Sequence, residues 1–227
     1  MKGIILAAGM GTRLGSLIPK PLTAIKNEKV IIDYQVDTLS EFIGIHNIYV
    51  VVGYKKELIM ERHPNLIYIY NNKYTHTNTA KSLLMAIEKI HNEDVLWMNG
   101  DVVFERKLIK RILDTSESCS LVDKKKCGEE EIKYSCYNDN YIEQISKKVK
   151  NAIGEAVGIH KLTQKKLDAF KNTLAEVHDN DYFEAALEKL TLKRELLLKT
   201  VDKEELFCTE VDFSEDLQEV IDYFPEK

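Results

Sequence analysis

The sequence predicts an α/β fold, a three-layer α/β/α sandwich around a mostly parallel central sheet. Apolar runs of strand length alternate with segments whose apolar residues recur at helical spacing, a rhythm typical of a parallel sheet covered by helices on both faces. The chain has 227 residues, of which 44% are hydrophobic and 30% charged, as in an ordinary globular domain. We therefore expect one Rossmann-like domain over residues 1–227.

Residues 1–122 carry the clearest alternation of strands and helices. The first strand is an apolar run at residues 3–6, and Gly44 ends the helix that follows it. Asn78 is suited to cap a later helix, because its side chain can accept a hydrogen bond from a free backbone N–H. In order, we expect a strand at 3–6, a helix at 30–43, a strand at 48–52, a helix at 55–62, a strand at 66–70, a helix at 79–90, a strand at 95–98, a helix around 108–113 and a strand at 120–122.

Residues 123–227 follow a different pattern. Two strands around a turn at residues 138–140 predict a small late β-hairpin. Asp181 and Glu184 have the spacing of a capping box at the start of a helix, and Ser214 is placed to cap the last helix. The other expected elements are a strand at 154–162, a helix at 163–176, and strands at 196–201 and 207–212.

The bulk properties exclude several classes of protein. The formal net charge of −5 argues against a nucleic-acid binder, which usually carries a basic stripe. No run of about 18 apolar residues is present, so we expect no membrane span. The N-terminus enters a strand directly, without the basic and apolar regions of a signal peptide, and we expect a cytoplasmic protein.

The loop after the first strand, LAAGMGTRLGSLIPKPL over residues 6–22, is rich in glycine. Ligands of open parallel sheets bind at the carboxyl ends of the strands, so this loop is well placed for a phosphate. A dinucleotide fingerprint matches poorly, because Leu14 takes the third glycine position and no acidic residue ends a second strand. A Walker A loop matches poorly as well, since no Lys-Ser or Lys-Thr pair follows Gly15.

The remaining chemical interpretation is a loop whose backbone N–H groups face a polyphosphate. Gly9 and Gly11 would let the backbone approach the phosphates without a Cβ clash. Arg13 would clamp phosphate oxygens with its planar fork, while Lys20, held between two prolines, would add a point charge. A glycine-rich turn without a chemical role stays open as the alternative.

This loop resembles the L-A-A-G-x-G-T-R-L…P-K-P-L signature of the sugar nucleotidyltransferase family. The resemblance implies a nucleotidyltransferase-type fold in which the loop wraps a nucleoside triphosphate and the lysine serves the α-phosphate. Residues 1–122 then form the nucleotide-binding half and residues 123–227 the acceptor-binding half. The nucleotide-binding residues that it implies are Leu6, Ala7, Ala8, Gly9, Gly11, Thr12, Arg13, Lys20, Asn78, Ser82 and Gly100, with Arg13 and Lys20 also catalytic.

Three acidic residues are candidates for a metal site. Asp101 follows the fourth expected strand in the segment NGD, so we expect it at the same sheet edge as the glycine loop. Glu210 and Asp212 are two residues apart in an expected strand, which places both carboxylates on one face. Carboxylate oxygens are the ligands that Mg²⁺ prefers, so we predict that these three residues hold Mg²⁺. As alternatives, Asp101 is a turn or cap residue and Asp212 caps the final helix.

The segment NNKYTHTNTAKSLLMA at residues 71–86 resembles the N-x-x-Y-x-x-x-N-x-x-S-L segment of phosphocholine cytidylyltransferase-like enzymes, although Ser82 lies one place further out. That branch includes transferases acting on phosphocholine, 2-aminoethylphosphonate and inositol 1-phosphate, and it implies CTP as donor. The expected reaction is Mg²⁺-dependent and gives a CDP-linked product and pyrophosphate. Two alternatives stay open: a UTP- or dTTP-dependent sugar-1-phosphate nucleotidyltransferase, and a non-catalytic nucleotide-sensing protein.

The acceptor is expected to bind over the later hairpin and strands. The segment ISKK resembles the I-S-K segment of the family, which makes Lys147 the candidate for gripping the acceptor phosphate. Asp123, Glu155 and Glu184, with the ring of Tyr182, are suited to a cationic amine through charge and cation–π attraction. The aromatic side chains could equally be core residues. The pattern leaves the oligomeric state open, with a homodimer among the options.

Overall fold

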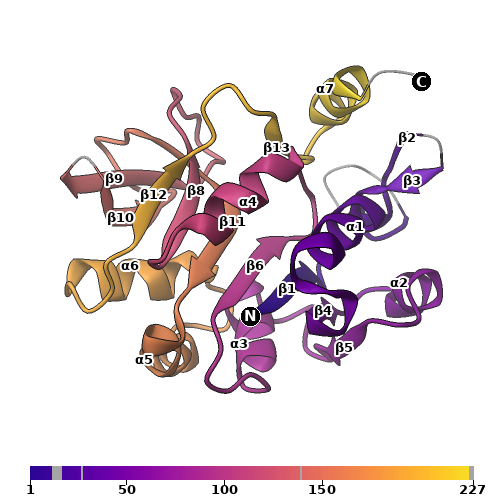
Figure 1. Ribbon diagram of the computed structural model, residues 1–227, viewed down its shortest axis with the longest axis horizontal. Helices are drawn as coiled ribbons and strands as arrows, with labels where there is room; N and C mark the ends of the chain where they lie inside the picture. The colour runs from indigo at the N-terminus through magenta and orange to yellow at the C-terminus, as the bar shows by residue number, and fades with distance from the viewer. Residues whose placement is uncertain (12–16, 27, 139, 225–227) are drawn as a thin grey trace.

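The structure, a computed structural model, describes residues 1–11, 17–26, 28–138 and 140–224, and nine of the strands in these ranges form one mixed sheet (Figure 1). In spatial order they are β5 (Ile67–Tyr70), β4 (Ile48–Val52), β1 (Lys2–Ala7), β6 (Val95–Asn99), β11 (Gly154–Leu162), β8 (Cys119–Asp123), β12 (Lys199–Asp202), β10 (Tyr141–Ser146) and β9 (Lys133–Asn138). The order confirms the predicted α/β fold class, with β1 in the parallel part of the sheet.

The direction of the strands changes between the two halves of the sheet. Strand β1 pairs in parallel with both β4 and β6, and β4 pairs in parallel with β5. Strand β11 instead runs antiparallel to β6 and β8, and the hairpin of β9 and β10 is antiparallel as well. Strand β12, in contrast, pairs in parallel with β8. The second half is therefore mixed where the first is parallel.

Helices cover both faces of the sheet, as predicted. The residues of β1 alternate between two cores, with Ile4 and Leu6 in one and Ile5 and Ala7 in the other, because successive side chains of a strand point to opposite faces. The first core packs against α3 (Thr79–Ile87), α5 (Gln164–Glu176) and α6 (Glu184–Leu192), and the second against α1 (Ile31–Ile43), α2 (Lys56–Arg62) and α4 (Arg106–Asp114). Figure 1 shows α1 and α4 on one side of the sheet and α3 and α5 on the other.

Smaller elements extend the chain beyond the main sheet. Strand β13 (Cys208–Glu210) pairs antiparallel with β7 (Val102–Phe104), which directly follows Asp101. The backbone N–H of Val211 also donates to the Asp101 carbonyl at 3.0 Å, so the late strand is fixed beside the NGD turn. The remaining elements are η2 (Lys20–Leu22), β2 (Ala24–Lys26), β3 (Lys29–Val30), η3 (Ile45–Asn47) and α7 (Ser214–Tyr223).

Two predicted helix caps are wrong. Helix α6 begins at Glu184 with the backbone of Phe183 at its N-cap, and the carboxylate of Asp181 accepts instead from the His178 backbone N–H at 2.9 Å. The ring of Phe183 is fully buried in the core, so it makes no side-chain cap hydrogen bond. In α7 the carboxylate of Asp216 accepts from the backbone N–H of Phe213 at 2.7 Å, so Asp216 caps the helix rather than Ser214.

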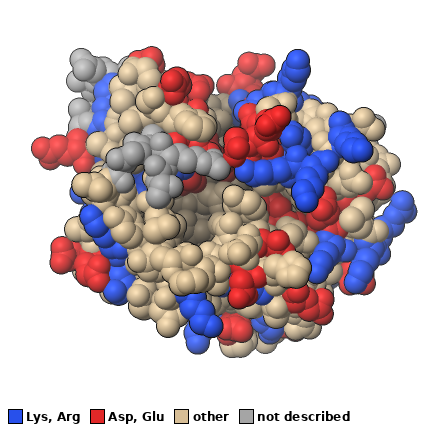
Figure 2. Space-filling view, turned by 180° about the vertical axis from the view of Figure 1, so that it is seen from behind, with Lys and Arg blue, Asp and Glu red and all other residues tan. Residues whose placement is uncertain are grey.

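Helices that could cross a membrane are not found in the part of the chain that the structure describes, because each is too short or too polar. Basic and acidic side chains are interspersed over the face drawn in Figure 2, which is hollowed near its centre. The visible wall of that hollow consists mostly of uncharged side chains.

Candidate active site

A cavity of about 420 Å³ opens where β1 and β6 end. Most of the predicted site residues line it: Leu6, Ala7, Gly9, Gly11, Lys20, Asn78, Gly100, Asp101, Lys147, Tyr182, Glu184, Glu210 and Asp212. The wall also contains residues that the sequence interpretation missed: Met10, Pro21, Thr79, Asn99, Glu130 and Ile132. Ala8, Ser82, Asp123 and Glu155 do not line it, and Thr12 and Arg13 lie outside the described residues.

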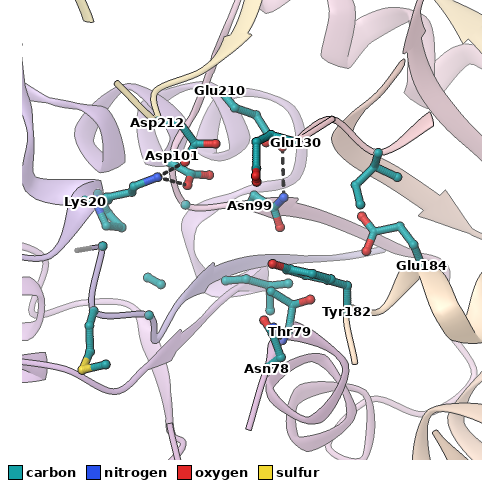
Figure 3. A pocket seen from close by; sticks show the side chains of 18 of the residues that line it. Lys20, Asn78, Thr79, Asn99, Asp101, Glu130, Tyr182, Glu184, Glu210 and Asp212 are labelled. Atoms are coloured by element: carbon teal, nitrogen blue, oxygen red, sulfur yellow. Dashed lines mark hydrogen bonds and ion pairs between the residues drawn. The ribbon is translucent and has the colours of Figure 1, made fainter. Parts of the chain in front are cut away.

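Lys20 reaches two of the predicted metal-binding carboxylates (Figure 3). Its ammonium donates to Asp101 Oδ2 at 3.2 Å and also to Asp212 Oδ1. The lysine begins η2, in which Pro19 is the N-cap residue and the Pro19 carbonyl accepts from the Leu22 N–H at 2.8 Å. This short turn fixes the backbone on both sides of the lysine.

Gly11 allows the glycine loop to pass beside that lysine. Its φ of +61° lies in the left-handed region, and a Cβ there would meet Lys20 Cγ at 2.6 Å. A residue with a side chain would therefore be strained and would push the lysine aside. Gly9 differs, since a Cβ built there meets nothing within 4 Å.

The charged groups of this cluster shift one another's pKa values. Burial raises the pKa of Asp101, Lys20 opposes that rise, and the neighbouring carboxylate of Asp212 adds to it. Burial lowers the pKa of Lys20, but attraction to Asp101 and Asp212 outweighs burial and raises it overall. Lys20 therefore stays a cation over the whole physiological range of pH.

The third predicted metal ligand, Glu210, is held by an amide. Asn99 Nδ2 donates to Glu210 Oε1 at 3.1 Å, and Gln35 Nε2 donates to the Asn99 carbonyl at 2.9 Å. Burial raises the pKa of Glu210 well above its ordinary range, and repulsion from Asp101 raises it further. Ionising Asp101 and Glu210 together therefore requires additional positive charge nearby.

A bound metal ion would supply this positive charge, provided that these residues suit one. Asp101, Glu210 and Asp212 provide carboxylate oxygens, the donor type that Mg²⁺ prefers, from segments that meet at one end of the cavity. Among the described residues, no three His, Cys, Asp or Glu side chains already converge as a preformed metal cluster. The donor set thus suits Mg²⁺ chemically, while Lys20 is the cation that contacts two of its carboxylates in this structure.

Gly158 makes room for the Asn99–Glu210 pair, which leads to a first prediction. A Cβ at Gly158 would lie 2.5 Å from Glu210 Oε1, and its φ of +66° disfavours any other residue. We expect Gly158→Ala to lower the free energy of unfolding by about 1–3 kcal/mol. Chemical denaturation measures this free energy of unfolding. The control is Gly9→Ala, whose free energy of unfolding is expected to stay within about 0.5 kcal/mol of wild type. Equal stability of both variants would contradict the crowding argument.

The amino-terminal end of α3 forms another wall. The Asn78 side chain accepts from the Thr79 N–H at 2.8 Å, which confirms the predicted cap. Ser82, one turn further on, is buried and accepts from Asn71 Nδ2 at 3.0 Å. Asn78 and Thr79 line the cavity, whereas the Ser82 hydroxyl is engaged with Asn71 inside the protein.

Asp123 and Glu155, two of the predicted acceptor-binding residues, lie opposite each other on β8 and β11. Glu155 is paired with Lys125 at 2.7 Å, and Asp123 with Lys203 at 3.5 Å. Burial raises the pKa of Glu155, although Lys125 opposes the rise. Lysines from neighbouring segments already neutralise both groups, so the structure does not bring them into the cavity.

Tyr182 and Glu184 lie at the end of the cavity away from Lys20 (Figure 3), and Lys147 also lines the cavity. The Lys147 ammonium pairs with Glu130 Oε2 at 3.0 Å and lies 5.4 Å from the centre of the Tyr182 ring. Glu184 is only 3% exposed, and burial raises its pKa to about 8. Glu130 belongs to the acidic run of residues 129–131, and only the fold places it in the cavity wall.

The raised pKa of Glu184 predicts a pH-dependent stability. Between its ordinary value of 4.5 and about 8, the unfolded chain ionises this carboxyl while the folded protein keeps it protonated. The folded state then binds more protons, so its stability falls as pH rises through this window. We expect the denaturation midpoint of Glu184→Gln to rise relative to wild type between pH 5 and pH 8. A constant difference across that range would show that the group titrates normally.

The fold and this arrangement are those of an α/β protein with its polar cavity at the carboxyl ends of parallel strands, and the chain matches the MobA-like NTP transferase domain over residues 3–170. That match covers more than half of the sequence, so the chain belongs to this family. The predicted nucleotidyltransferase family resemblance is confirmed.

Two curated relatives are similar over part of their length. Choline-phosphate cytidylyltransferase of Streptococcus pneumoniae is 39% identical over 101 residues, which is 42% of this chain and 43% of that protein. CMP-5'-(3-aminopropyl)phosphonate synthase of Streptomyces rubellomurinus is 30% identical over 132 residues, 53% of this chain and 20% of that protein. The chain thus spans less than half the length of these two relatives.

Among solved structures, the inositol-1-phosphate CTP transferase from T. maritima superposes with a TM-score of 0.80. Its sequence is 21% identical, and the match covers 97% of this chain and 94% of that one. At this identity the similarity establishes the fold and not the substrate.

Proposed function

We propose that this protein transfers the nucleotidyl group of CTP to a small acceptor that bears a phosphate or phosphonate. A CDP- or CMP-linked product and pyrophosphate result. The observation that carries the proposal is the contact of Lys20 with Asp101 and Asp212 at the edge where β1 and β6 end. The two curated relatives, named for cytidylyltransferase and CMP-phosphonate synthase activities, support CTP as donor.

In the proposed reaction an oxygen of the acceptor phosphate attacks the α-phosphorus of CTP. A new P–O bond forms as the bond from the α-phosphorus to the bridging oxygen breaks, and pyrophosphate leaves with that electron pair. The second pKa of a phosphate monoester is about 6, so the nucleophile is already largely ionised at neutral pH. No residue is needed as general base for such an acceptor.

The residues supply positive charge and positioning. Lys20 would offset the charge that builds up around the α-phosphate, where a fixed cation is more effective than a mobile one. Asp101, Glu210 and Asp212 would hold Mg²⁺, which would neutralise phosphate charge and orient the leaving group. Arg13 and the glycine loop would contact the triphosphate, and Lys147 the acceptor phosphate.

Pyrophosphate release tests this function directly. The purified protein is incubated with CTP, UTP, dTTP, ATP or GTP, with Mg²⁺ present or removed by EDTA. Each nucleotide is tested with phosphocholine, phosphoethanolamine, 2-aminoethylphosphonate, inositol 1-phosphate and glucose 1-phosphate. We expect Mg²⁺-dependent release with CTP and at least one acceptor of the first four. Release with UTP or dTTP and glucose 1-phosphate alone would overturn the proposed substrates, and CTP binding without any turnover would indicate a sensor.

A further inference from the structure

A buried carboxyl group closes the end of the cavity away from Lys20. Glu184 lines the cavity at the start of α6, and its side chain is nine-tenths or more buried. Its Oε2 atom has no hydrogen-bond partner among the described residues. Figure 3 shows the carboxyl group turned toward the cavity. Buried polar atoms are nearly always hydrogen-bonded in folded proteins, so this oxygen points to a missing donor.

The surroundings of Glu184 leave that donor to be supplied from the cavity. The nearby ammonium of Lys147 already pairs with Glu130 at 3.0 Å and faces the ring of Tyr182. Lys147 lowers the pKa of Glu184 but burial dominates, so the carboxyl stays protonated while no further cation lies beside it. A ligand cation would lower that pKa and favour the ionised form.

The wall chemistry distinguishes between two kinds of cation. Quaternary ammonium groups are recognised by cages of several aromatic rings, since they cannot donate hydrogen bonds. Among the described residues that line the cavity, Tyr182 is the only aromatic one, and Lys147 already occupies a position 5.4 Å from its ring centre. A primary ammonium instead donates charge-assisted hydrogen bonds, which an unpartnered carboxylate oxygen can accept.

We infer that Glu184 is a specificity-determining residue that selects acceptors with a primary ammonium group at the end remote from the phosphate, in preference to a quaternary one. The inference rests on the proposed function, because it assigns the acceptor class of that same site. Glu184 receives a hydrogen bond from the acceptor ammonium, and the acceptor phosphate extends past Lys147 toward Lys20. Each methyl group added to the nitrogen removes one donor and adds bulk against the carboxyl.

The test compares four acceptors that differ only in methylation of nitrogen: phosphoethanolamine, its N-methyl and N,N-dimethyl forms, and phosphocholine. Pyrophosphate release gives kcat/KM for each with CTP and Mg²⁺. We expect kcat/KM for phosphoethanolamine to exceed that for phosphocholine by about 10- to 100-fold, the effect of losing one hydrogen bond to a charged group. In Glu184→Gln this ratio is expected to fall to within about threefold of unity, whereas the exposed Glu176→Gln keeps the wild-type ratio.

Calorimetric binding of the same acceptors, with a non-hydrolysable CTP analogue and Mg²⁺ present, separates this inference from the proposed function. Without turnover of any acceptor, the proposed function fails, yet tighter binding of phosphoethanolamine that Glu184→Gln abolishes still supports the role of Glu184. Equal binding of all four, or binding of none, overturns it. A kcat/KM for phosphocholine that equals or exceeds the value for phosphoethanolamine also overturns the role of Glu184. That result leaves the proposed nucleotidyl transfer intact. The wild-type methylation series decides the matter even if Glu184→Gln folds poorly.

Discussion

Lys20→Met is expected to lower kcat for pyrophosphate release by about 10²- to 10³-fold, the usual effect of removing one fixed group that stabilises transition-state charge. Methionine keeps much of the length and the apolar stem of lysine but cannot donate to Asp101 or Asp212. The loss would fall on kcat more than on KM, because charge around the α-phosphate is greatest in the transition state. Steady-state kinetics with CTP and the preferred acceptor measures both.

The control for this variant is Lys29→Met. Lys29 forms an exposed ion pair with Asp37 at 2.8 Å, and such surface pairs contribute little. We expect wild-type kinetics for Lys29→Met, and thermal unfolding of Lys20→Met at the assay pH shows whether that variant is folded. A Lys20→Met protein that is folded and retains more than about a tenth of wild-type kcat would refute the assigned role of Lys20.

Asp101→Asn is expected to lower kcat/KM by about 10²- to 10³-fold. The change keeps the size of the side chain and the backbone bond from the Val211 N–H to the Asp101 carbonyl, so the NGD turn and β13 stay in place. It removes one anionic oxygen donor, and we therefore expect half-maximal activity to require a higher Mg²⁺ concentration. Titration of activity with Mg²⁺ measures this shift beside the loss of rate.

Asp37→Asn serves as the matched control, because it removes an exposed carboxylate from a surface pair with Lys29. It should have the wild-type dependence on Mg²⁺. Asp101→Asn with an unaltered Mg²⁺ requirement and a normal rate would show that the carboxylate is only a turn residue, which is the alternative that the sequence left open.

The parallel half of the fold and one end of the site could be predicted because their signals are local. Strand-length apolar runs separated by helical spacing specify β1, β4 and β6, and parallel strands end at one edge. Lys20 and Asp101 each follow closely on a recognisable turn or strand. The common edge predicts that Lys20 and Asp101 lie close together, and in the structure Lys20 Nζ is 3.2 Å from Asp101 Oδ2.

The acceptor end could not be predicted in the same way. Asp123 and Glu155 occur at suitable places in the sequence, but Lys203 and Lys125 neutralise them through contacts that depend on the fold. Glu130 belongs to an acidic run that is typical of solvated loop, yet it pairs with Lys147 in the cavity wall. Charged pairs formed between distant or irregular segments leave no periodic signal.

The sequence by itself determined that the chain alternates strands with helices and that a glycine loop with Lys20 follows the first strand, because these features arise from contiguous residues. The tertiary structure decided which carboxylates meet. Antiparallel pairing of β13 with β7 brings Glu210 and Asp212 to Asp101, and the start of α6 buries Glu184 at the opposite end of the cavity. Burial and hydrogen-bond satisfaction depend on groups far apart in the sequence, so only the packed fold fixes them.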